Sequence, residues 1–597
     1  MDLEHFAMTK PHITRRTADL TRCEFSPSVP PLLQRIYAAR GAENDLALAR
    51  TLQGLPGPEG LLGIGEAVVL LEQAINEQQS VLIIGDFDAD GATSTALTLL
   101  ALRAMGFSRV SYIVPNRFEY GYGLTPEIVE LAKQQTPDLI ITVDNGISSV
   151  SGVEAAKAAG IKVLITDHHL PGAQLPAADA IVNPNQHGCE FPGKNLAGVG
   201  VVFYLMSALR SRLRDSGWFA ENSSLEPESS PELKRAEPNM ADWLDLVALG
   251  TVADVVPLDA TNRILVHQGL QRIRAGKTRP GIQALLDLSG RERQRLVAAD
   301  LGFAIGPRLN AAGRLDDMSI GIQCLLETDP YLAREYALQL DELNRDRRVI
   351  EADMQREALV ALEQLNLDEQ QLPWGLCLFD ADWHQGVVGL LASRIKDRVH
   401  RPVIAFADAG NGEFKGSARS IPGLHIRDAL DAVASRHPEL ISKFGGHAMA
   451  AGLSLPADRY WDFVAAFDDE VRRQLSPSDL EAEILTDGTL DITELNIDTA
   501  QLLRESGPWG QHFPEPLFEG EFYIVQQRIV GEKHLKLMLA LDQGKQQLID
   551  AIAFNVDTEQ WPNSAAEKVS LVYKLDINLW QGRESVQLLI ESIRLLR

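Results

Sequence analysis

The segment from residue 79 to residue 169 constrains the fold most strongly, because short apolar runs alternate there with stretches of helical spacing. The apolar runs are those in SVLIIGDFDADG, RVSYIVPNR, PDLIITVDNG and IKVLITDHH, and the intervening stretches include TSTALTLLALRAMG and TPEIVELAKQQ. Continuous apolar strands that alternate with helices are typical of a parallel sheet with both faces covered. The sequence therefore predicts a βαβαβαβ arrangement of the α/β class.

The remainder of the chain predicts further domains around this sheet. Residues 371–475 show a second α/β pattern, and residues 476–597 contain short apolar or alternating runs that suggest a small β-barrel, for which an OB-fold is one candidate. The predicted organisation is a helical segment over 1–78, a sheet domain over 79–329 with a polar insertion at 215–240, a long connecting helix over 330–370, a second α/β lobe over 371–475 and the barrel over 476–597.

Composition narrows the possible partners and compartments. The 597 residues include four scattered cysteines and no CxxC pair, which argues against zinc ribbons and a disulfide framework. There is no secretory signal pattern and no apolar run near the roughly 20 residues that cross a bilayer, so a cytoplasmic protein without membrane contact is expected. Because the formal net charge is −26, binding to nucleic acid would require locally basic channels.

Acidic and histidine side chains follow several of the predicted strands. Asp86, Asp88 and Asp90 lie in GDFDADG, Asp144 lies in TVDNG, and Asp254 lies in LGTVADVVPL. The run TDHH adds Asp167, His168 and His169. Ligands of open α/β sheets bind beyond the carboxyl ends of the strands, so we expect these clusters to converge on one crevice.

Each of these residues also has a purely structural interpretation, since an Asp after a strand is often a helix N-cap. Several carboxylates in one crevice, however, repel one another unless cations neutralise them. Carboxylates with one imidazole suit Mn²⁺ or Mg²⁺, and the number of carboxylates favours two ions bridged by Asp144. In an extended chain His168 and His169 would point in opposite directions, so we expect one to bind metal and the other to serve the substrate.

Other catalytic patterns are missing from the sequence. There is no G-x-S-x-G elbow, GDFDADGATS lacks the lysine of a P-loop, and no GxGxxG follows the first strand. The motif analysis therefore leaves metal-dependent hydrolysis as the favoured chemistry.

GDFDADG, VDNG, DHH and ADVVPL, in this order, resemble the DHH phosphoesterase superfamily. FGGHAMAAG is similar to the DHHA1 domain of the same superfamily, and PNRFEYGYGL, GPRLNAAGR, WHQGVVGLLASR and GSARS extend the match. With the C-terminal barrel, the combination resembles the branch of bacterial exonucleases specific for single-stranded DNA, from about residue 70 to the end. Some branches have a ligand histidine four residues before the first ligand Asp. Ile84 occupies that position here, which fits the exonuclease branch and argues against the pyrophosphatase branch.

The resemblance implies metal ligands at Asp88, Asp90, Asp144, His168 and Asp254, with Asp86 in a possible supporting role and His169 on a substrate phosphate. It implies 5′→3′ degradation of single-stranded DNA to mononucleotides in recombination and repair, with a single-strand-binding protein and a helicase as candidate partners. The alternatives are a phosphodiesterase for short oligonucleotides or cyclic dinucleotides and a non-catalytic scaffold of the same superfamily. The substrate-binding residues it implies are Arg117, Arg308, Asn310, Arg314, His384, Ser417, Arg419, Gly445, Gly446 and His447.

Aromatic residues near the C-terminus are candidates for stacking on bases, although barrel aromatics are more often part of the core. They are Trp509, Phe513, Phe518, Tyr523 and Trp580.

Overall fold

The computed structural model describes residues 11–115, 123–172, 174–219, 236–364, 372–542 and 547–596. Arg117 and residues 220–235 of the predicted insertion lie outside this part of the chain. Two compact units are present. One comprises Ala18–Asn344 with Leu502–Glu515, and the other comprises Met1–Thr17, Arg345–Gln501 and Pro516–Arg597. The first is called the metal-site unit and the second the barrel unit.

The metal-site unit is built on a five-stranded parallel sheet. Its strands are β2 (Val81–Gly85), β3 (Val110–Ile113), β4 (Leu139–Val143), β5 (Lys162–Thr166) and β6 (Ala180–Val182), in the order β3-β2-β4-β5-β6. The chain leaves β2 for β3 on one side and later returns to place β4 on the other side of β2. The strand order therefore reverses between β2 and β4, which is where α/β sheets open a crevice for ligands.

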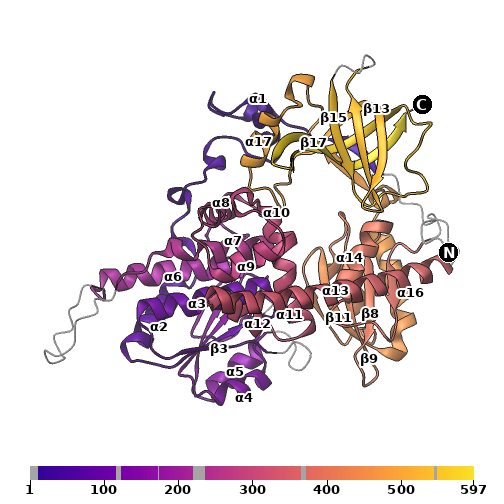
Figure 1. Cartoon of the computed structure of the whole chain (residues 1–597). Helices are drawn as coiled ribbons and strands as arrows, with labels where there is room; N and C mark the ends of the chain where they lie inside the picture. Colours follow the sequence, from indigo (N-terminus) through magenta and orange to yellow (C-terminus); the bar gives the residue numbers. More distant parts are fainter. Residues whose placement is uncertain are drawn as a thin grey trace. The chain divides into compact units, whose positions relative to one another are not determined.

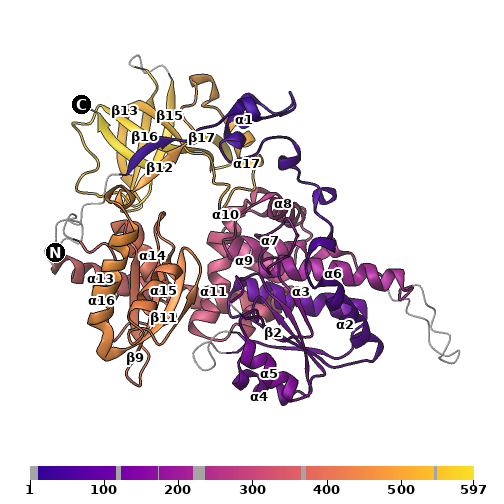
Figure 2. The ribbon, with the colours of Figure 1, turned by 180° about the vertical axis from the view of Figure 1, so that it is seen from behind.

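Helices cover both faces of this sheet, as the continuous apolar strands predicted. Helices α4 (Pro126–Lys133) and α5 (Val150–Ala158) share one buried core with apolar side chains of β2, β4 and β5. Helices α2 (Ile64–Asn76), α3 (Ala89–Met105) and α6 (Gly198–Asp215) lie on the opposite face (Figures 1 and 2). The α/β class and the parallel sheet are thus confirmed.

More helices complete this unit. They are α1 (Pro31–Ala38), α7 (Leu244–Ala253), α8 (Ala260–Arg274), α9 (Pro280–Leu288), α10 (Ala298–Asp300), a π-helical turn over Leu301–Ile305, α11 (Gly306–Leu315) and α12 (Ser319–Leu326). Helix α13 (Pro330–Gln364) begins in this unit and continues beyond Asn344.

The barrel unit contains a mixed five-stranded sheet. Its strands are β7 (Leu376–Phe379), β8 (Val403–Asp408), β9 (Glu413–Arg419), β10 (Lys443–Gly446) and β11 (Ala450–Pro456), in the order β10-β11-β9-β8-β7. Helix α14 (Val388–Val399) packs on β8 and β9. Helices α15 (Ile426–Arg436) and α16 (Tyr460–Gln474) form a core with apolar residues of β8, β9 and β11.

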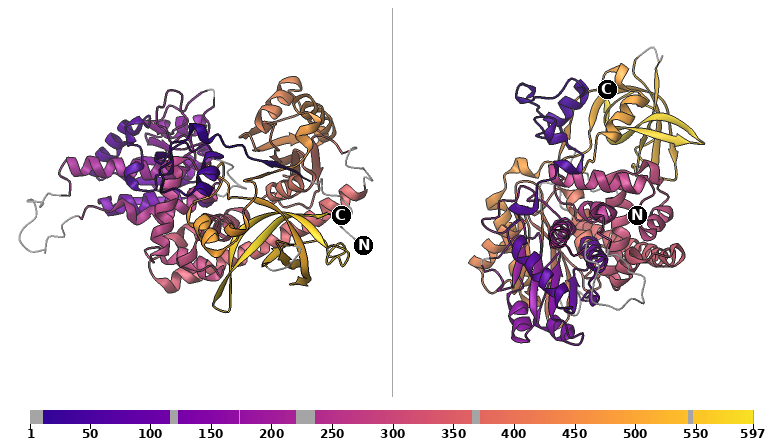
Figure 3. Two further views of the ribbon diagram at one scale, coloured as in Figure 1. Left: turned by 90° about the horizontal axis from the view of Figure 1, so that it is seen from above. Right: turned by 90° about the vertical axis from the view of Figure 1, so that its left-hand side faces the viewer.

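The C-terminal strands close into a barrel, drawn in yellow in Figure 3, which confirms the predicted barrel. The strands are β13 (Phe518–Val530), β14 (His534–Ala540), β15 (Leu548–Ala553), β16 (Lys568–Trp580) and β17 (Arg583–Leu596). Residues 489–495, which have a strand-like pattern, instead contain a 3₁₀ turn at Ile492–Glu494, and α17 (Ile497–Glu505) follows. No helix in the described ranges is long and apolar enough to cross a bilayer.

Two sequence-based expectations outside the sheet differ from the structure. The segment over 1–78 is not wholly helical, because β1 (His12–Arg15) pairs in parallel with β12 (Glu483–Thr486). Trp509 and Phe513 belong to the metal-site unit, where their rings pack with Tyr37 at centroid distances of 6.0 and 6.1 Å. Phe513 and Phe518 are buried, so neither is a stacking platform on the surface.

Candidate metal centre

The loop GDFDADG passes from strand to helix, so its three aspartates do not alternate along one extended strand. Strand β2 ends at Gly85, and Asp88 is the N-cap of α3, with its Oδ1 accepting hydrogen bonds from the backbone N–H groups of Asp90 (2.9 Å) and Gly91 (3.0 Å). A Cβ at Gly91 would lie 2.5 Å from the Asp86 carbonyl oxygen. The sharp turn therefore requires glycine and brings the Asp86 and Asp88 side chains together.

Asp90 ties this loop to the start of α6. Its Oδ2 accepts a hydrogen bond from Gly198 N–H (2.6 Å), and its Oδ1 accepts one from Val199 N–H (3.0 Å). The positive end of the α6 dipole favours a carboxylate there. Even so, full burial and the neighbouring Asp88 raise the pKa of Asp90 to about 7. A divalent cation would remove this conflict by favouring the ionised carboxylate.

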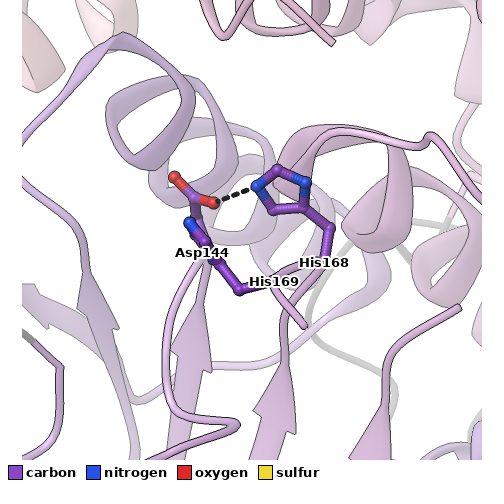
Figure 4. A group of neighbouring side chains, drawn as sticks. All are labelled: Asp144, His168 and His169. Atoms are coloured by element: carbon purple, nitrogen blue, oxygen red, sulfur yellow. Dashed lines mark ion pairs between the residues drawn. The ribbon is translucent and has the colours of Figure 1, made fainter. Parts of the chain in front are cut away.

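Asp144, His168 and Asp254 meet beside this loop. The Oδ1 atom of Asp144, directly after β4, lies 3.1 Å from Nε2 of His168 (Figure 4). Oδ2 of Asp254, which follows the last residue of α7, lies 3.5 Å from the same nitrogen. Burial first, and then repulsion from nearby carboxylates such as Asp90 and Asp88, raises the pKa values of Asp144 and Asp254 well above their usual range.

The two histidines do not point in opposite directions, because the chain leaves the extended conformation after β5. Their ring centroids are 4.4 Å apart. Nδ1 of His169 lies 2.7 Å from Oδ1 of Asp167, which also accepts hydrogen bonds from the backbone N–H groups of His168 (2.7 Å) and His169 (3.0 Å). Asp167 thus fixes the orientation of His169.

Attraction within the His169–Asp167 pair outweighs the cost of burying it. Burial would lower the pKa of His169, but the Asp167 carboxylate raises it to about 9. Burial would likewise raise the pKa of Asp167, but His169 brings it down to about 2. The protonated imidazole of His169 is suited to bind a phosphate oxygen.

Two asparagines that the sequence analysis missed hold the histidine backbone. Asn183 Nδ2 donates to the carbonyl of His169 (2.9 Å), and Asn185 Nδ2 donates to the carbonyl of His168 (2.5 Å). Both follow β6, the strand next to β5. The polar run VNPNQ at that strand end is the signal that could have revealed them.

The assembled side chains match the donor set of a hard divalent cation. Ligand atoms lie within 4.8 Å of one another in each of three groups, and Asp144 and His168 each occur in two of them. Oδ2 of Asp254 is buried and receives no hydrogen bond from the described residues. Oxygen-rich sites with one imidazole suit Mn²⁺ or Mg²⁺. The groups are Asp144–His168–His169, Asp90–His168–Asp254 and Asp86–Asp88–Asp144.

Three residues expected to bind substrate lie on α11. Arg308 is buried, and its Nε and Nη2 lie 2.9 and 2.8 Å from Oδ1 of Asp341. Oδ1 of Asn310 accepts a hydrogen bond from the backbone N–H of Ala89 (2.7 Å), within the metal-site loop. Arg314 lies in the last turn of the helix.

In the barrel unit, Ser417 and Arg419 lie two residues apart on β9, next to the start of α14. Nη1 of Arg419 donates to Oγ of Ser417 (3.0 Å) and to the carbonyl of Ala418 (2.8 Å). A Cβ at Gly389 would lie 2.8 Å from both Arg419 Nη2 and Ser417 Oγ, so a side chain there would displace the guanidinium or the hydroxyl. Arg419 forms no ion pair within the described residues, which leaves a half-buried cation beside a helix N-terminus.

The glycine-rich hairpin and the loop before α14 belong to the same part of the barrel unit. In the strand register, Gly445 of β10 lies opposite Gly452 of β11, which lies opposite Ser417. Gly446 has a φ of 146°, and His447 N–H donates to the carbonyl of Ala450 (2.8 Å). Before α14, Nδ1 of His384 accepts from Gly386 N–H (3.1 Å).

Comparison with known proteins agrees with this architecture. The chain is 58% identical over 570 residues to the single-stranded-DNA-specific exonuclease RecJ of Dickeya dadantii, covering 96% of this chain and 97% of that protein. The chain belongs to the RecJ family. Three family models match within it, the N-terminal domain of the DHH family over 80–251, the DHHA1 domain over 373–473 and the RecJ OB domain over 486–592.

Solved RecJ structures share the fold and contain divalent cations. The crystal structure of RecJ from Thermus thermophilus in complex with Mn²⁺ has a TM-score of 0.77 at 28% identity, covering 98% of this chain and 80% of that chain. The structure of the same protein with Mg²⁺ has a TM-score of 0.72 at 26% identity, covering 98% and 79%. These two cations are those that the donor set favours.

Proposed function

We propose that this chain is a metal-dependent exonuclease that degrades single-stranded DNA from its 5′ end to mononucleotides. The observation that carries the proposal is the cluster of carboxylates and His168 at the crevice between β2 and β4, in a chain of the RecJ family. From its membership of the RecJ family we also propose a role in recombination and repair, with a single-strand-binding protein and a helicase as partners.

Two cations are proposed, with Asp144 between them. Asp144 belongs both to the group with His168 and to the group with Asp86 and Asp88, which supports a bridging position. When bound, such a pair would activate water and neutralise charge on a phosphoryl group. His169, held through Nδ1 by Asp167, is assigned to a phosphate oxygen of the substrate.

Ser417 and Arg419 are the proposed site for the 5′-terminal phosphate. The Arg419 guanidinium, which forms no ion pair with the described residues, favours a phosphate group together with the Ser417 hydroxyl and the N-terminus of α14. Anchoring the terminal phosphate there would set the polarity of digestion. The closed barrel is proposed to add affinity for the unpaired strand, as OB-folds commonly do.

Degradation of labelled strands in Mn²⁺ tests this proposal. We expect 5′-phosphorylated single strands to yield mononucleotides, while blunt duplex resists, and we expect Asp144→Ala to abolish cleavage with the fold retained. Hydrolysis confined to short oligonucleotides or cyclic dinucleotides would favour the phosphodiesterase alternative. No hydrolysis of any of these substrates would favour the scaffold alternative.

The 5′ preference is tested separately with Arg419→Ala. The variant should lose much of its efficiency on 5′-phosphorylated strands and much less on 5′-hydroxyl strands. Lys415→Ala is the matched control, because Lys415 lies on the same strand, is exposed and makes no ion pair within the described residues. An equal loss on both kinds of end in Arg419→Ala would reassign Arg419 to general contact with the backbone.

A further inference from the structure

Helix α11 contacts the metal-site loop directly. The backbone at Gly313 is so close that a Cβ there would lie 1.7 Å from the carbonyl oxygen of Phe87. One turn earlier, Asn310 Oδ1 accepts the 2.7 Å hydrogen bond from Ala89 N–H. Ala89 lies between Asp88 and Asp90, so this bond acts on the short segment that carries both candidate ligands.

The helix is itself firmly anchored. Arg308 bonds to Asp341 of α13 through Nε and Nη2, and its Nη1 donates to the carbonyl of Ala304 (2.5 Å). Helix α11 follows directly after the π-helical turn over Leu301–Ile305. Such turns are rare, and where they occur they frequently lie at functional sites. On the other side, a Cβ at Gly306 would lie 3.1 Å from Cβ of Ala253, next to Asp254. Helix α11 therefore contacts both the loop that carries Asp88 and the C-terminal end of α7.

The backbone N–H of Ala89 is in the first turn of α3, where a helix has no internal acceptor for it. Asp88 caps the next two N–H groups through Oδ1. Without an acceptor for Ala89, the first turn would have to move or leave a polar group unsatisfied. Either change would alter the position of the Asp88 and Asp90 carboxylates.

We infer that Asn310 is a positioning residue for the metal centre, which fixes the loop of Asp88 and Asp90 through Ala89, rather than a contact to substrate phosphate. The inference rests on the metal centre of the proposed function. It assigns GPRLNAAGR a structural part in metal binding, with Arg308 as the anchor, Asn310 as the acceptor and Gly313 as the point of close approach.

The test measures Mn²⁺ affinity of the full chain by calorimetry without DNA, for wild type, Asn310→Ala and Asn310→Asp. Outer residues that orient ligands typically change metal affinity by about 10–100-fold. We expect a loss of at least about tenfold in Asn310→Ala, and recovery of most of it in Asn310→Asp, which keeps an oxygen acceptor. Asn239→Ala is the matched control, since Asn239 makes the same kind of bond to a backbone N–H at Ala241, away from the site.

A second measurement separates this role from phosphate binding. Affinity for a 5′-phosphorylated single strand in EDTA should be unchanged in both Asn310 variants. If Asn310 contacts phosphate, strand affinity should fall, and more in Asn310→Asp because the added carboxylate repels phosphate. That result, or wild-type Mn²⁺ affinity in Asn310→Ala, would overturn the inference. If Asn310→Ala does not fold, the strand affinity of Asn310→Asp still decides between the two roles. Failure of the wild type to bind Mn²⁺ would instead reject the proposed metal centre.

Discussion

Asp254 illustrates how a single residue of the candidate centre opposes folding. Its Oδ2 is buried without a hydrogen bond from the described residues, and burial and neighbouring carboxylates raise its pKa well above the usual range. Buried like charges cost free energy unless a counter-charge is present. A role as a metal ligand therefore explains why Asp254 is buried here, whereas in a purely structural role its burial would only cost free energy.

Asp254→Asn should consequently stabilise the metal-free protein and weaken metal binding. Removing one of several repelling carboxylates should raise the thermal midpoint in EDTA. Mn²⁺ affinity should fall, since an amide is a weaker ligand than a carboxylate. Calorimetry with and without Mn²⁺ checks both effects, and Asp287→Asn, at an exposed position, is the control. A lower midpoint with unchanged Mn²⁺ affinity would contradict the repulsion argument.

At the scale of secondary-structure elements, the N-terminus of α6 is the part of the centre that sequence patterns could not predict. Asp90 accepts hydrogen bonds from Gly198 and Val199, and a Cβ at Gly198 would lie 2.7 Å from Cβ of Asp144. The strands were predictable because their apolar runs are continuous, and Asp88, Asp144 and His168 because they follow strand ends. Contacts between a strand end and a distant helix leave no periodic signal.

The absence of a local sequence signal also explains other differences between the predicted and the observed structure. The pairing of β1 with β12 joins distant segments, and the position of Trp509 against Tyr37 depends on tertiary packing. The directions of His168 and His169 were mispredicted because the argument assumed extended backbone, whereas Asp167 accepts hydrogen bonds from both backbone N–H groups.

Gly198→Ala should disturb the centre through this helix start. The added methyl group would push Asp144 or α6 away, and overpacking of this kind typically costs about 1–3 kcal/mol. We expect a lower thermal midpoint and weaker Mn²⁺ binding. Gly200→Ala is the matched control on the same helix, because the nearest atom to its Cβ would be the terminal Cδ2 of Leu196, at 3.0 Å. Equal Mn²⁺ affinities in the two variants would show that the spacing between α6 and Asp144 does not matter for the metal.

For the molecule as a whole, the centre links folding to pH and to metal. The chain carries a formal net charge of −26, and three aspartates of the centre, Asp90, Asp144 and Asp254, have raised pKa values. A carboxyl group whose pKa is raised on folding binds its proton more tightly in the folded state. Its contribution to stability is therefore full below the unfolded pKa near 4 and is lost as the pH rises through the folded pKa.

The stabilisation by Mn²⁺ should accordingly grow between about pH 5 and pH 8. Asp90 alone, with its pKa moved from 3.8 to about 7, corresponds to about 4 kcal/mol lost by the metal-free protein at high pH. The His169–Asp167 pair does not reverse this trend. Asp167, with a pKa lowered to about 2, keeps its contribution across the interval. The contribution of His169, whose pKa is raised from 6.5 to about 9, begins to fall above about pH 6.5, in the same direction as that of the aspartates. Mn²⁺ requires ionised ligands, so it competes with protons at low pH and relieves carboxylate repulsion at high pH.

Thermal midpoints in EDTA and in saturating Mn²⁺, measured from pH 5 to pH 8, should diverge with rising pH, and the two midpoints of Asp254→Asn should diverge less. Parallel curves for the two conditions would mean that these carboxylates do not bind the cation.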